Sequence, residues 1–275
     1  WAMDDPMPAI DGLTVYCSTI EGTSTMTKKP TGYIIYQGPS ALDGQPIVAI
    51  AISKSKNTKT SNMVQTYILR ADIDPREANR TGQDASICGT CPHRGSPNNY
   101  VKGLATGRTC YVRIDQGPLI VYKSMLRGIY PVATGHKAIA AIGAGRMVRI
   151  GTYGDGAAVP SYVWDSLLAQ AAGHTAYSHQ SGMTQSTYDA SRYMVSADSE
   201  SAAWQAWNAG ARTFRVIWDR SDIVRHKEVL CPASAEAGYR TTCDKCGLCG
   251  GASVKAKSIA IVAHGAGANM FKAGR

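Results

Sequence analysis

The sequence predicts an α/β protein: a complete or partial (βα) barrel of mainly parallel strands, with an N-terminal β-rich segment and cysteine-rich metal-binding loops. Three observations favour this fold. Short apolar runs alternate with stretches of helical periodicity from about residue 117 onward, the chain before that point reads as strands and loops, and polar or reactive residues follow nearly every expected strand. An open doubly wound sheet is the alternative.

The β-rich segment covers residues 1–115 and carries the first cysteines. Apolar runs at 32–37 and 46–52 flank a turn rich in Gly, Pro and Asp, which is typical of a hairpin with a long loop. A third β-like run covers 63–69, and Asp74-Pro75 then favours a turn or the start of a helix.

The second segment, residues 116–275, has the βα pattern and ends in the second set of cysteines. Helical periodicity covers 161–172 and 199–209. Spacing of about 20 residues between strands predicts parallel strands with right-handed crossovers. The expected strands are 147–152, 175–178, 193–196, 213–218, 227–230 and 258–263. We expect both segments to form one compact domain.

Composition limits the classes of function. The chain has 275 residues, 44% of them hydrophobic and 18% charged, which is typical of a globular protein. Its net charge of +9 favours an anionic small molecule or nucleic acid as partner, although so diffuse a charge is equally typical of plain solubility. No apolar run is long enough for a membrane span and no secretory signal is evident, so we expect a cytoplasmic protein without a membrane partner. The sequence does not indicate an oligomeric state.

The cysteines are the strongest signal in the sequence. Seven of the eight fall into two groups. The first cysteine group is Cys88, Cys91 and Cys110, and the second cysteine group is Cys231, Cys243, Cys246 and Cys249. Two thiolates separated by two residues can bind one metal from a tight turn. We therefore predict a metal at each group, whereas isolated Cys17 is expected to be a buried apolar residue or an inert thiol.

Three chemistries compete for the second cysteine group. Disulfides are disfavoured, because cysteines so close in sequence pair poorly and no secretion signal is present. Zinc sites usually have two C-x2-C pairs with a long spacer, whereas C-x2-C-x2-C is the spacing of bacterial ferredoxins. The spacing favours a [4Fe–4S] cluster, with zinc as the alternative.

The first cysteine group offers only three thiolates. A zinc ion there would need a fourth ligand, for which His93 is available. A three-cysteine [4Fe–4S] cluster would instead leave one iron open to a substrate or cofactor. Both readings stay open at the level of sequence.

Several longer motifs surround the cysteines and expected strand ends. They are ICGTCPHR at 87–94, CYV at 110–112, QGPLIVY at 116–122, VRIGTYGD at 148–155, CPAS at 231–234 and CDKCGLCGG at 243–251. These motifs resemble an uncharacterised family of bacteriophage and prophage proteins, and more distantly the phage "gene product 88" family. The resemblance covers most of the chain from about residue 33. It implies a phage origin, a bacterial host cell and a metal-binding cysteine layout, but no reaction.

The layout also resembles the radical S-adenosylmethionine enzymes, which combine a three-cysteine cluster near the start of a βα barrel with, in some branches, a later auxiliary cluster. That resemblance implies S-adenosylmethionine as a further cofactor. The chain departs from that superfamily's C-x3-C-x2-C loop, since its C-x2-C pair is followed by a third cysteine after 18 further residues. Its Gly-Gly-Glu strand is also missing, with Tyr153-Gly154-Asp155 loosely in that place.

Side chains at the expected strand ends are the other candidates for the site. Asp155 fits a base or ligand-binding carboxylate, or simply a good turn residue. His179 fits an acid–base group or a hydrogen-bonded structural histidine. Arg220 fits a phosphate ligand or a surface ion pair. The predicted catalytic residues are Asp155, His179, Asp198 and Arg220, and the predicted cofactor-binding residues are Gly154, His264 and Gly265.

Two functions follow. The first is a phage iron–sulfur enzyme that acts on a nucleotide, nucleic acid or other anionic substrate at the three-cysteine cluster, with a four-cysteine auxiliary cluster. The second is a non-catalytic nucleic-acid-binding protein of phage replication or transcription, stabilised by zinc or iron–sulfur. Hydrolase and NTPase functions lack support, because no G-x-S-x-G, H-E-x-x-H or P-loop lysine motif is present.

Overall fold

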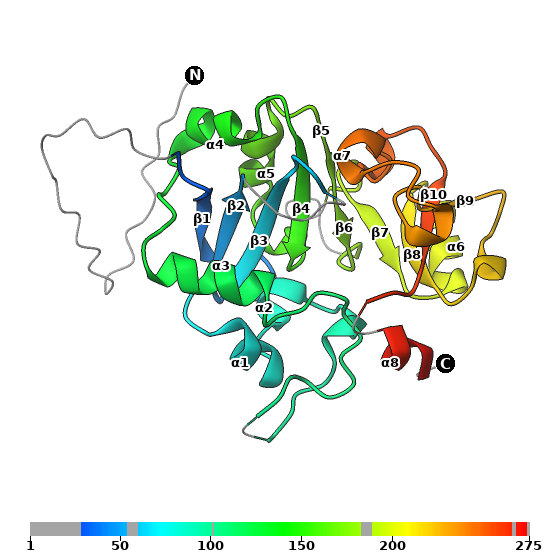
Figure 1. Cartoon of the computed structure of the whole chain (residues 1–275), viewed down its shortest axis with the longest axis horizontal. Helices are drawn as coiled ribbons and strands as arrows, with labels where there is room; N and C mark the ends of the chain where they lie inside the picture. The colour runs from blue at the N-terminus through cyan, green and yellow to red at the C-terminus, as the bar shows by residue number, and fades with distance from the viewer. Residues whose placement is uncertain (1–28, 54–59, 101, 183–188, 266–267, 274–275) are drawn as a thin grey trace, which may run out of the picture.

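The computed structural model describes residues 29–53, 60–100, 102–182, 189–265 and 268–273. The prediction for Cys17 lies outside these residues. The chain forms two five-stranded sheets flanked by short helices (Figure 1). The strand orders are β1-β2-β3-β4-β5 and β6-β7-β8-β10-β9.

The first sheet is mixed. β1 (Gly32–Pro39), β2 (Pro46–Ile52) and β3 (Val64–Arg70) pair antiparallel, as the predicted hairpin requires. β4 (Met147–Tyr153) and β5 (Gly173–Thr175) then add in parallel. Because β3 and β4 are neighbours, the N-terminal and C-terminal segments share this sheet.

The second sheet is parallel at each of its strand pairs. One residue, Ala176, separates β5 from the first strand of the second sheet, so one extended segment borders both sheets. Its strands are β6 (Tyr177–Ser178), β7 (Met194–Ala197), β8 (Thr213–Ile217), β9 (Glu228–Leu230) and β10 (Ser258–Val262).

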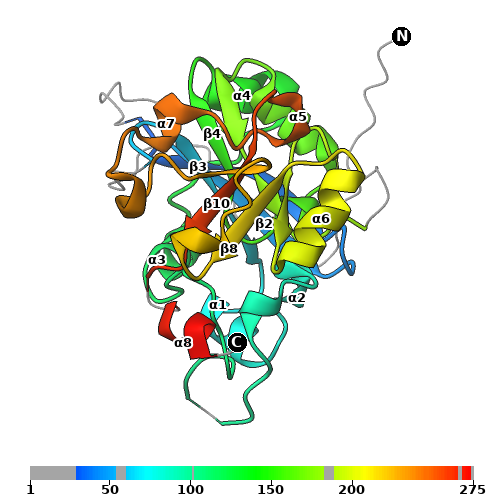
Figure 2. The same cartoon turned by 90° about the vertical axis from the view of Figure 1, so that its right-hand side faces the viewer.

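The helices connect and cover the strands. α7 lies at one end of the second sheet and α8 at the other, in both views (Figures 1 and 2). The helices are α1 (Pro75–Arg80), α2 (Ala85–Cys88), α3 (Gly117–Leu126), α4 (Gly135–Gly143), α5 (Ser161–Leu168), α6 (Glu200–Asn208), α7 (Cys243–Cys246) and α8 (Ala268–Ala273).

Helix starts follow from local chemistry. Asp74 accepts a hydrogen bond from the backbone N–H of Arg76 over 2.9 Å, and Pro75 occupies the first helical position of α1. Ser199 caps α6 in the same way by accepting from the N–H of Ala202 over 3.1 Å. These caps fix where two of the helices begin.

The main core lies between the first sheet and its helices. β2 contributes a continuous apolar run that is buried from Ile47 to Ile52. Trp164 of α5 is fully buried, and its indole N–H donates to the carbonyl of Gly156 over 2.8 Å. Burial of such side chains supplies most of the stabilisation of a domain.

The prediction of a mixed α/β fold is confirmed. The described strands do not close into a barrel, since β1 and β9 stand at the ends of the strand orders. Among the described residues, no helix has the length and apolar character that crossing a bilayer requires.

Candidate metal centres and functional site

All seven cysteines of the two groups line one cavity of about 620 Å³. The first group reaches it from α2 and the following loops, and the second from the position after β9, from α7 and from the loop after α7. Neither group includes a disulfide. Residues separated by up to about 160 positions in the sequence therefore meet around one space.

The walls of the cavity come from alternate positions of the strands. Successive side chains of a strand point to opposite faces, so most of the strand residues that line the cavity are two apart, and Thr152 and Ala197 are exceptions. The same strands end in the polar residues that the sequence singled out. The strand residues that line the cavity include Gln65, Tyr67, Arg149, Gly151, Tyr153, Thr175, Tyr177, Ser196, Phe214, Val216, Ile259 and Ile261.

The loop of the first cysteine group is held by backbone and guanidinium hydrogen bonds. The N–H of Cys91 donates to the carbonyl of Cys88 over 3.2 Å, and the N–H of Cys110 donates to the carbonyl of His93 over 3.0 Å. Arg94 donates to the carbonyl of Gly89 over 3.0 Å. Burial raises the pKa of Cys88 and of Cys110, and the nearby thiols raise both pKa values further. Bound cations would offset the cost of ionising these thiols.

The second cysteine group gathers around one helical turn. Cys243 and Cys246 begin and end α7, and Gly247 follows in the left-handed conformation with a φ of 63°. The N–H of Cys231 donates to the carbonyl of Ala260 over 2.8 Å, which ties this buried cysteine to β10.

Electrostatics links the four thiols of this group. Burial raises the pKa of Cys249 to about 12, against the lowering effect of a hydrogen bond with Tyr177. Cys231, Cys243 and Cys246 raise it further, which requires all three to lie close to Cys249. The second cysteine group is therefore a cluster in space and not only in sequence.

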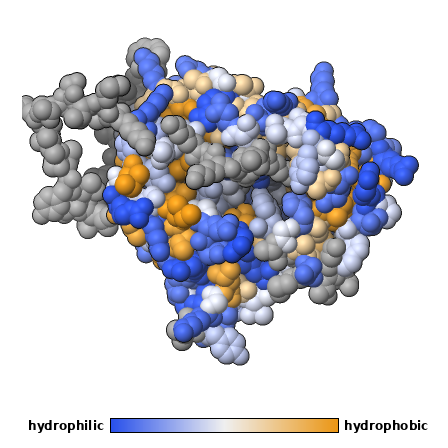
Figure 3. Space-filling view, viewed as in Figure 1, coloured by the Kyte–Doolittle hydropathy of each residue, from blue (hydrophilic) through white to orange (hydrophobic). Residues whose placement is uncertain are grey.

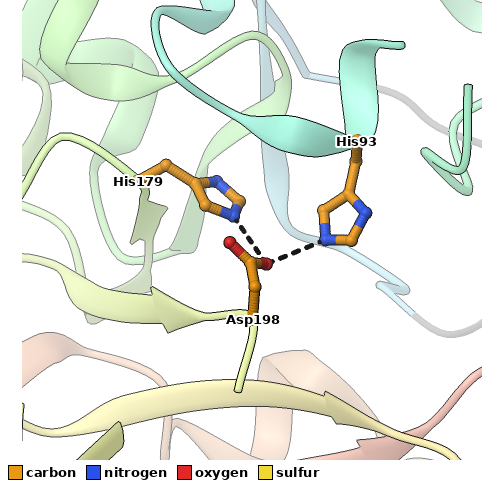
Figure 4. A group of neighbouring side chains, drawn as sticks. All are labelled: His93, His179 and Asp198. Atoms are coloured by element: carbon orange, nitrogen blue, oxygen red, sulfur yellow. Dashed lines mark hydrogen bonds and ion pairs between the residues drawn. The ribbon is translucent and has the colours of Figure 1, made fainter. Parts of the chain in front are cut away.

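Beside the first cysteine group lies a His–Asp triad: His93, His179 and Asp198 (Figure 4). Nε2 of His93 lies 3.0 Å from Oδ1 of Asp198, and Nε2 of His179 lies 3.2 Å from the same oxygen. The three side chains come from the 3-10 turn Pro92–Arg94 after Cys91, the end of β6 and the end of β7.

Contacts within the triad shift the pKa values of its side chains. Burial alone lowers the pKa of His179, but hydrogen bonds to Asp198 and Cys91 outweigh it and raise the pKa to about 10. Burial raises the pKa of Asp198, yet the bonds to His179 and His93 hold it well below its usual range. Asp198 is therefore a carboxylate at neutral pH.

Asp155 is bound by the protein on both carboxylate oxygens. Oδ1 accepts from the N–H of Ala157 over 3.0 Å. Oδ2 accepts from the hydroxyl of Ser178 and the N–H of His179, each over 3.0 Å. Burial raises the pKa of this carboxyl, and the three hydrogen bonds lower it in part. Asp155 thus positions the end of β6, where His179 begins the next loop.

Arg149 places a cation in the cavity. Its Nη2 donates to the Tyr111 hydroxyl over 2.6 Å, and its guanidinium lies 5.8 Å from the ring centroid of Tyr177. Its Nε is buried and has no hydrogen-bond partner among the described residues. Burial lowers the pKa of Arg149, but Tyr111, Tyr177 and the second cysteine group raise it above its ordinary value.

The structure brings together nearly all predicted site residues. Arg220 is the exception: it is exposed on a short 3-10 turn, Arg220–Asp222, and does not line the cavity. Those that do line it are the seven cysteines, Gly154, Asp155, His179, Asp198, His264 and Gly265.

Two of the predicted cofactor-binding residues have a local structural role. Gly154 has a φ of 82°, and an added Cβ would lie 2.8 Å from Cβ of Ile68. Packing alone therefore requires glycine there. His264 is exposed, and its Nδ1 hydrogen-bonds the carbonyl of Val262 over 2.9 Å.

Sequence reasoning missed Arg149, Tyr177 and Tyr111. Arg149 interrupts an alternating apolar pattern on β4, where it sits between Val148 and Ile150. A charged residue inside such a strand, aligned with Tyr153 on the same face, was the available signal.

No protein-family model matches this chain, and no curated protein or solved structure matches it either.

Proposed function

We propose that this chain is an iron–sulfur enzyme that holds two [4Fe–4S] clusters at one cavity and binds its substrate between them. The observation that carries the proposal is the convergence of both cysteine groups on that cavity. The parallel strands with cavity-facing alternate residues support reading the fold as a partial (βα) barrel, where sites lie at the carboxyl ends of strands.

The spacing of the thiols supports clusters over zinc ions. At Zn–S bonds of about 2.3 Å, the sulfurs of a tetrahedral site lie about 3.8 Å apart. Among the described residues, the His–Asp triad is the group whose donor atoms all lie within 4.8 Å of one another, and the thiols do not form such a group. In a [4Fe–4S] cube each thiolate binds a different iron, so the sulfurs stay farther apart.

The surroundings of the first cysteine group favour an open iron. His93, the available fourth ligand, directs Nε2 to Asp198 and Nδ1 to the hydroxyl of Thr109 at 2.7 Å. Both ring nitrogens are thus engaged away from the thiols. A reduced cluster with an open iron supplies an electron and a coordination position to a bound ligand.

The walls of the cavity suggest an anionic substrate with apolar parts. Phe214, Val216 and Ile259 give apolar contact. Arg149 is half-buried, and its buried Nε has an unused N–H among the described residues, which fits a carboxylate or phosphate. A nucleotide has this combination of an apolar base and phosphate charge, and a phage origin would fit it. Hydrophilic and hydrophobic side chains are intermixed over the face shown in Figure 3.

The first experiment measures metal and sulfide after purification and cluster reconstitution without oxygen. We expect brown protein with about eight iron and eight acid-labile sulfide per chain. Cys88→Ala with Cys91→Ala, or Cys243→Ala with Cys246→Ala, should each leave about four of both. Cys17→Ala is the matched control and should change neither. Colourless protein with zinc and no sulfide would contradict the proposal and favour the non-catalytic nucleic-acid-binding alternative.

The second experiment tests the open iron. S-adenosylmethionine is the first probe, because the layout of the cysteines resembles the enzymes that use it. Binding at the open iron should change the electron paramagnetic resonance (EPR) spectrum of the reduced first cluster and leave that of the second unchanged. An unchanged spectrum with this probe, with nucleotides and with cyanide would argue for a closed first cluster without a catalytic role.

A further inference from the structure

We infer that the His–Asp triad of His93, His179 and Asp198 is a separate mononuclear site for a divalent first-row metal ion of the Fe(II) and Mn(II) class. The inference does not depend on the cysteine groups holding iron–sulfur clusters. It depends on the geometry of three donors that are distant in sequence, and on the cavity they face.

The distances between donors fit one ion. Metal–nitrogen and metal–oxygen bonds of about 2.1 Å at right angles place adjacent donors about 3.0 Å apart, and tetrahedral angles place them about 3.4 Å apart. The two Nε2···Oδ1 distances are 3.0 and 3.2 Å. Two of the three donor–donor distances therefore match adjacent ligands of one ion, and the three ligand atoms all lie within 4.8 Å of one another.

The choice of donors points to the kind of metal. Two imidazoles and one carboxylate on one face of the ion, with the other positions open, is the ligand set of non-haem Fe(II) sites. Catalytic zinc sites use similar ligands at tetrahedral angles, which place adjacent donors about 3.4 Å apart, farther than the 3.0 and 3.2 Å found here. Here the thiols stay outside the triad, although Cys91 hydrogen-bonds the ring of His179.

Outer contacts hold the histidines in the orientation that a ligand needs. A metal-binding imidazole commonly donates its second N–H to a nearby acceptor. Nδ1 of His93 lies 2.7 Å from the Thr109 hydroxyl and can donate to it when Nε2 binds a metal. The backbone of His179 is fixed by its N–H bond to Asp155 over 3.0 Å.

The open side of the site faces the cavity. All three side chains line it, and that of Asp198 is 40% exposed whereas those of His93 and His179 are 19% and 16% exposed. The free positions on the ion would therefore bind oxygen atoms of a ligand in the cavity, next to the first cysteine group.

The test uses Mn(II) as the probe on the full chain, with free Mn(II) measured by EPR. We expect one tightly bound Mn(II) per chain. His93→Ala, His179→Ala and Asp198→Asn should each weaken binding at least about 100-fold, and Thr109→Val about tenfold. His136→Ala is the matched control, because its ring bonds Ser166 over 3.0 Å, outside the cavity. Mn(II) affinity that is equal in wild type and triad variants would overturn the inference.

A second measurement does not need the variants to fold. Pulsed EPR of the Mn(II)-loaded wild type should detect nitrogen couplings from directly bound imidazole. Bound Mn(II) without these couplings would overturn the site. Acid-labile sulfide is measured on the same samples: protein without sulfide that still binds Mn(II) through nitrogen would remove the proposed clusters but keep this site.

Discussion

The backbone N–H of His179 donates to Oδ2 of Asp155 over 3.0 Å, so a buried carboxylate sets the direction in which the triad histidine leaves β6. Ser178 donates to the same oxygen. A residue that the sequence marked as catalytic thus acts on the site through the backbone.

Asp155→Ala should therefore destabilise the protein strongly. It leaves the N–H groups of Ala157 and His179 and the hydroxyl of Ser178 without their acceptor in a buried place. We expect a loss of about 2–4 kcal/mol in the free energy of unfolding, measured by denaturant titration. Asp155→Asn keeps one carbonyl acceptor and should lose about half as much. Equal stability of the alanine variant and wild type would contradict the positioning role.

The glycines of the second cysteine group allow a matched comparison. Gly247 has a φ of 63°, and an added Cβ would meet Cε of Met147 only at 3.8 Å. Gly251 has a φ of 72°, and an added Cβ would lie 2.4 Å from the carbonyl oxygen of Ser191. Gly247→Ala should cost about 1 kcal/mol of stability from the backbone conformation alone.

Gly251→Ala adds a clash with backbone that cannot move aside easily. We expect it to lower the melting temperature much more than Gly247→Ala and to reduce the iron bound by the second cysteine group. Calorimetry and iron assays on the two variants check this. An equal decrease in melting temperature and bound iron in both variants would mean that the positive φ of the glycine, and not its packing against Ser191, causes the effect.

Local sequence patterns predicted much of the fold. The predicted strands at 46–52 and 213–218 match β2 and β8 to within a residue, because each is an apolar run bounded by turn residues. Helix α3 was missed because it is apolar on both sides: Leu119 and Val121 are buried, whereas Ile120 is 62% and Leu126 64% exposed. Such a segment lacks the one-sided periodicity that predicts a helix.

The sequence predicted which residues belong to the site, but not which of them lie close together in space. Spacing alone separated the cysteines into two groups, since each group has a short local motif. The contact of His93 with Asp198 joins residues 105 positions apart. Nothing local encodes it, because it depends on how the turn after Cys91 packs against the end of β7. Sequence reasoning considered His93 only as an available fourth ligand of the first cysteine group, because those cysteines are its neighbours along the chain.

Acid should destabilise the protein through His174. Burial lowers the pKa of this histidine below its ordinary 6.5, and Arg192 lowers it further, while Asp189 and the bond from Nε2 to the carbonyl of Arg192 raise it. Protonation of His174 is therefore disfavoured in the folded state but not in the unfolded state. The free energy of unfolding has its full value above pH 6.5, the ordinary pKa that applies to the unfolded chain. It decreases as the pH falls through the lower pKa of the folded state.

Denaturant titrations from pH 8 to pH 5 check this expectation. In His174→Gln, which keeps a hydrogen-bond donor but has no titrating group, the decline of unfolding free energy below pH 6.5 should be smaller than in wild type. His226→Gln, at an exposed position beside the ring of Trp204, is the control and should leave the decline unchanged. Identical pH profiles of His174→Gln and wild type would show that other groups cause the acid sensitivity.

In the proposed enzyme, Arg149 should raise the reduction potential of the second cluster, in addition to its proposed role in substrate binding. Its charge interacts with Cys243 and Cys249, so removing it leaves more uncompensated negative charge beside a reduced cluster. Arg149→Met should therefore lower the reduction potential of the second cluster and leave that of the first unchanged. Redox titration followed by EPR measures both reduction potentials.

Arg149→Lys retains a positive charge, so the reduction potential of its second cluster should stay close to that of wild type. The matched control is Arg146→Met, because Arg146 donates to the carbonyls of Ser53 and Asn62 and does not line the cavity. An equal shift in the Arg146 variant would mean that overall charge, and not the position of Arg149, sets the potential.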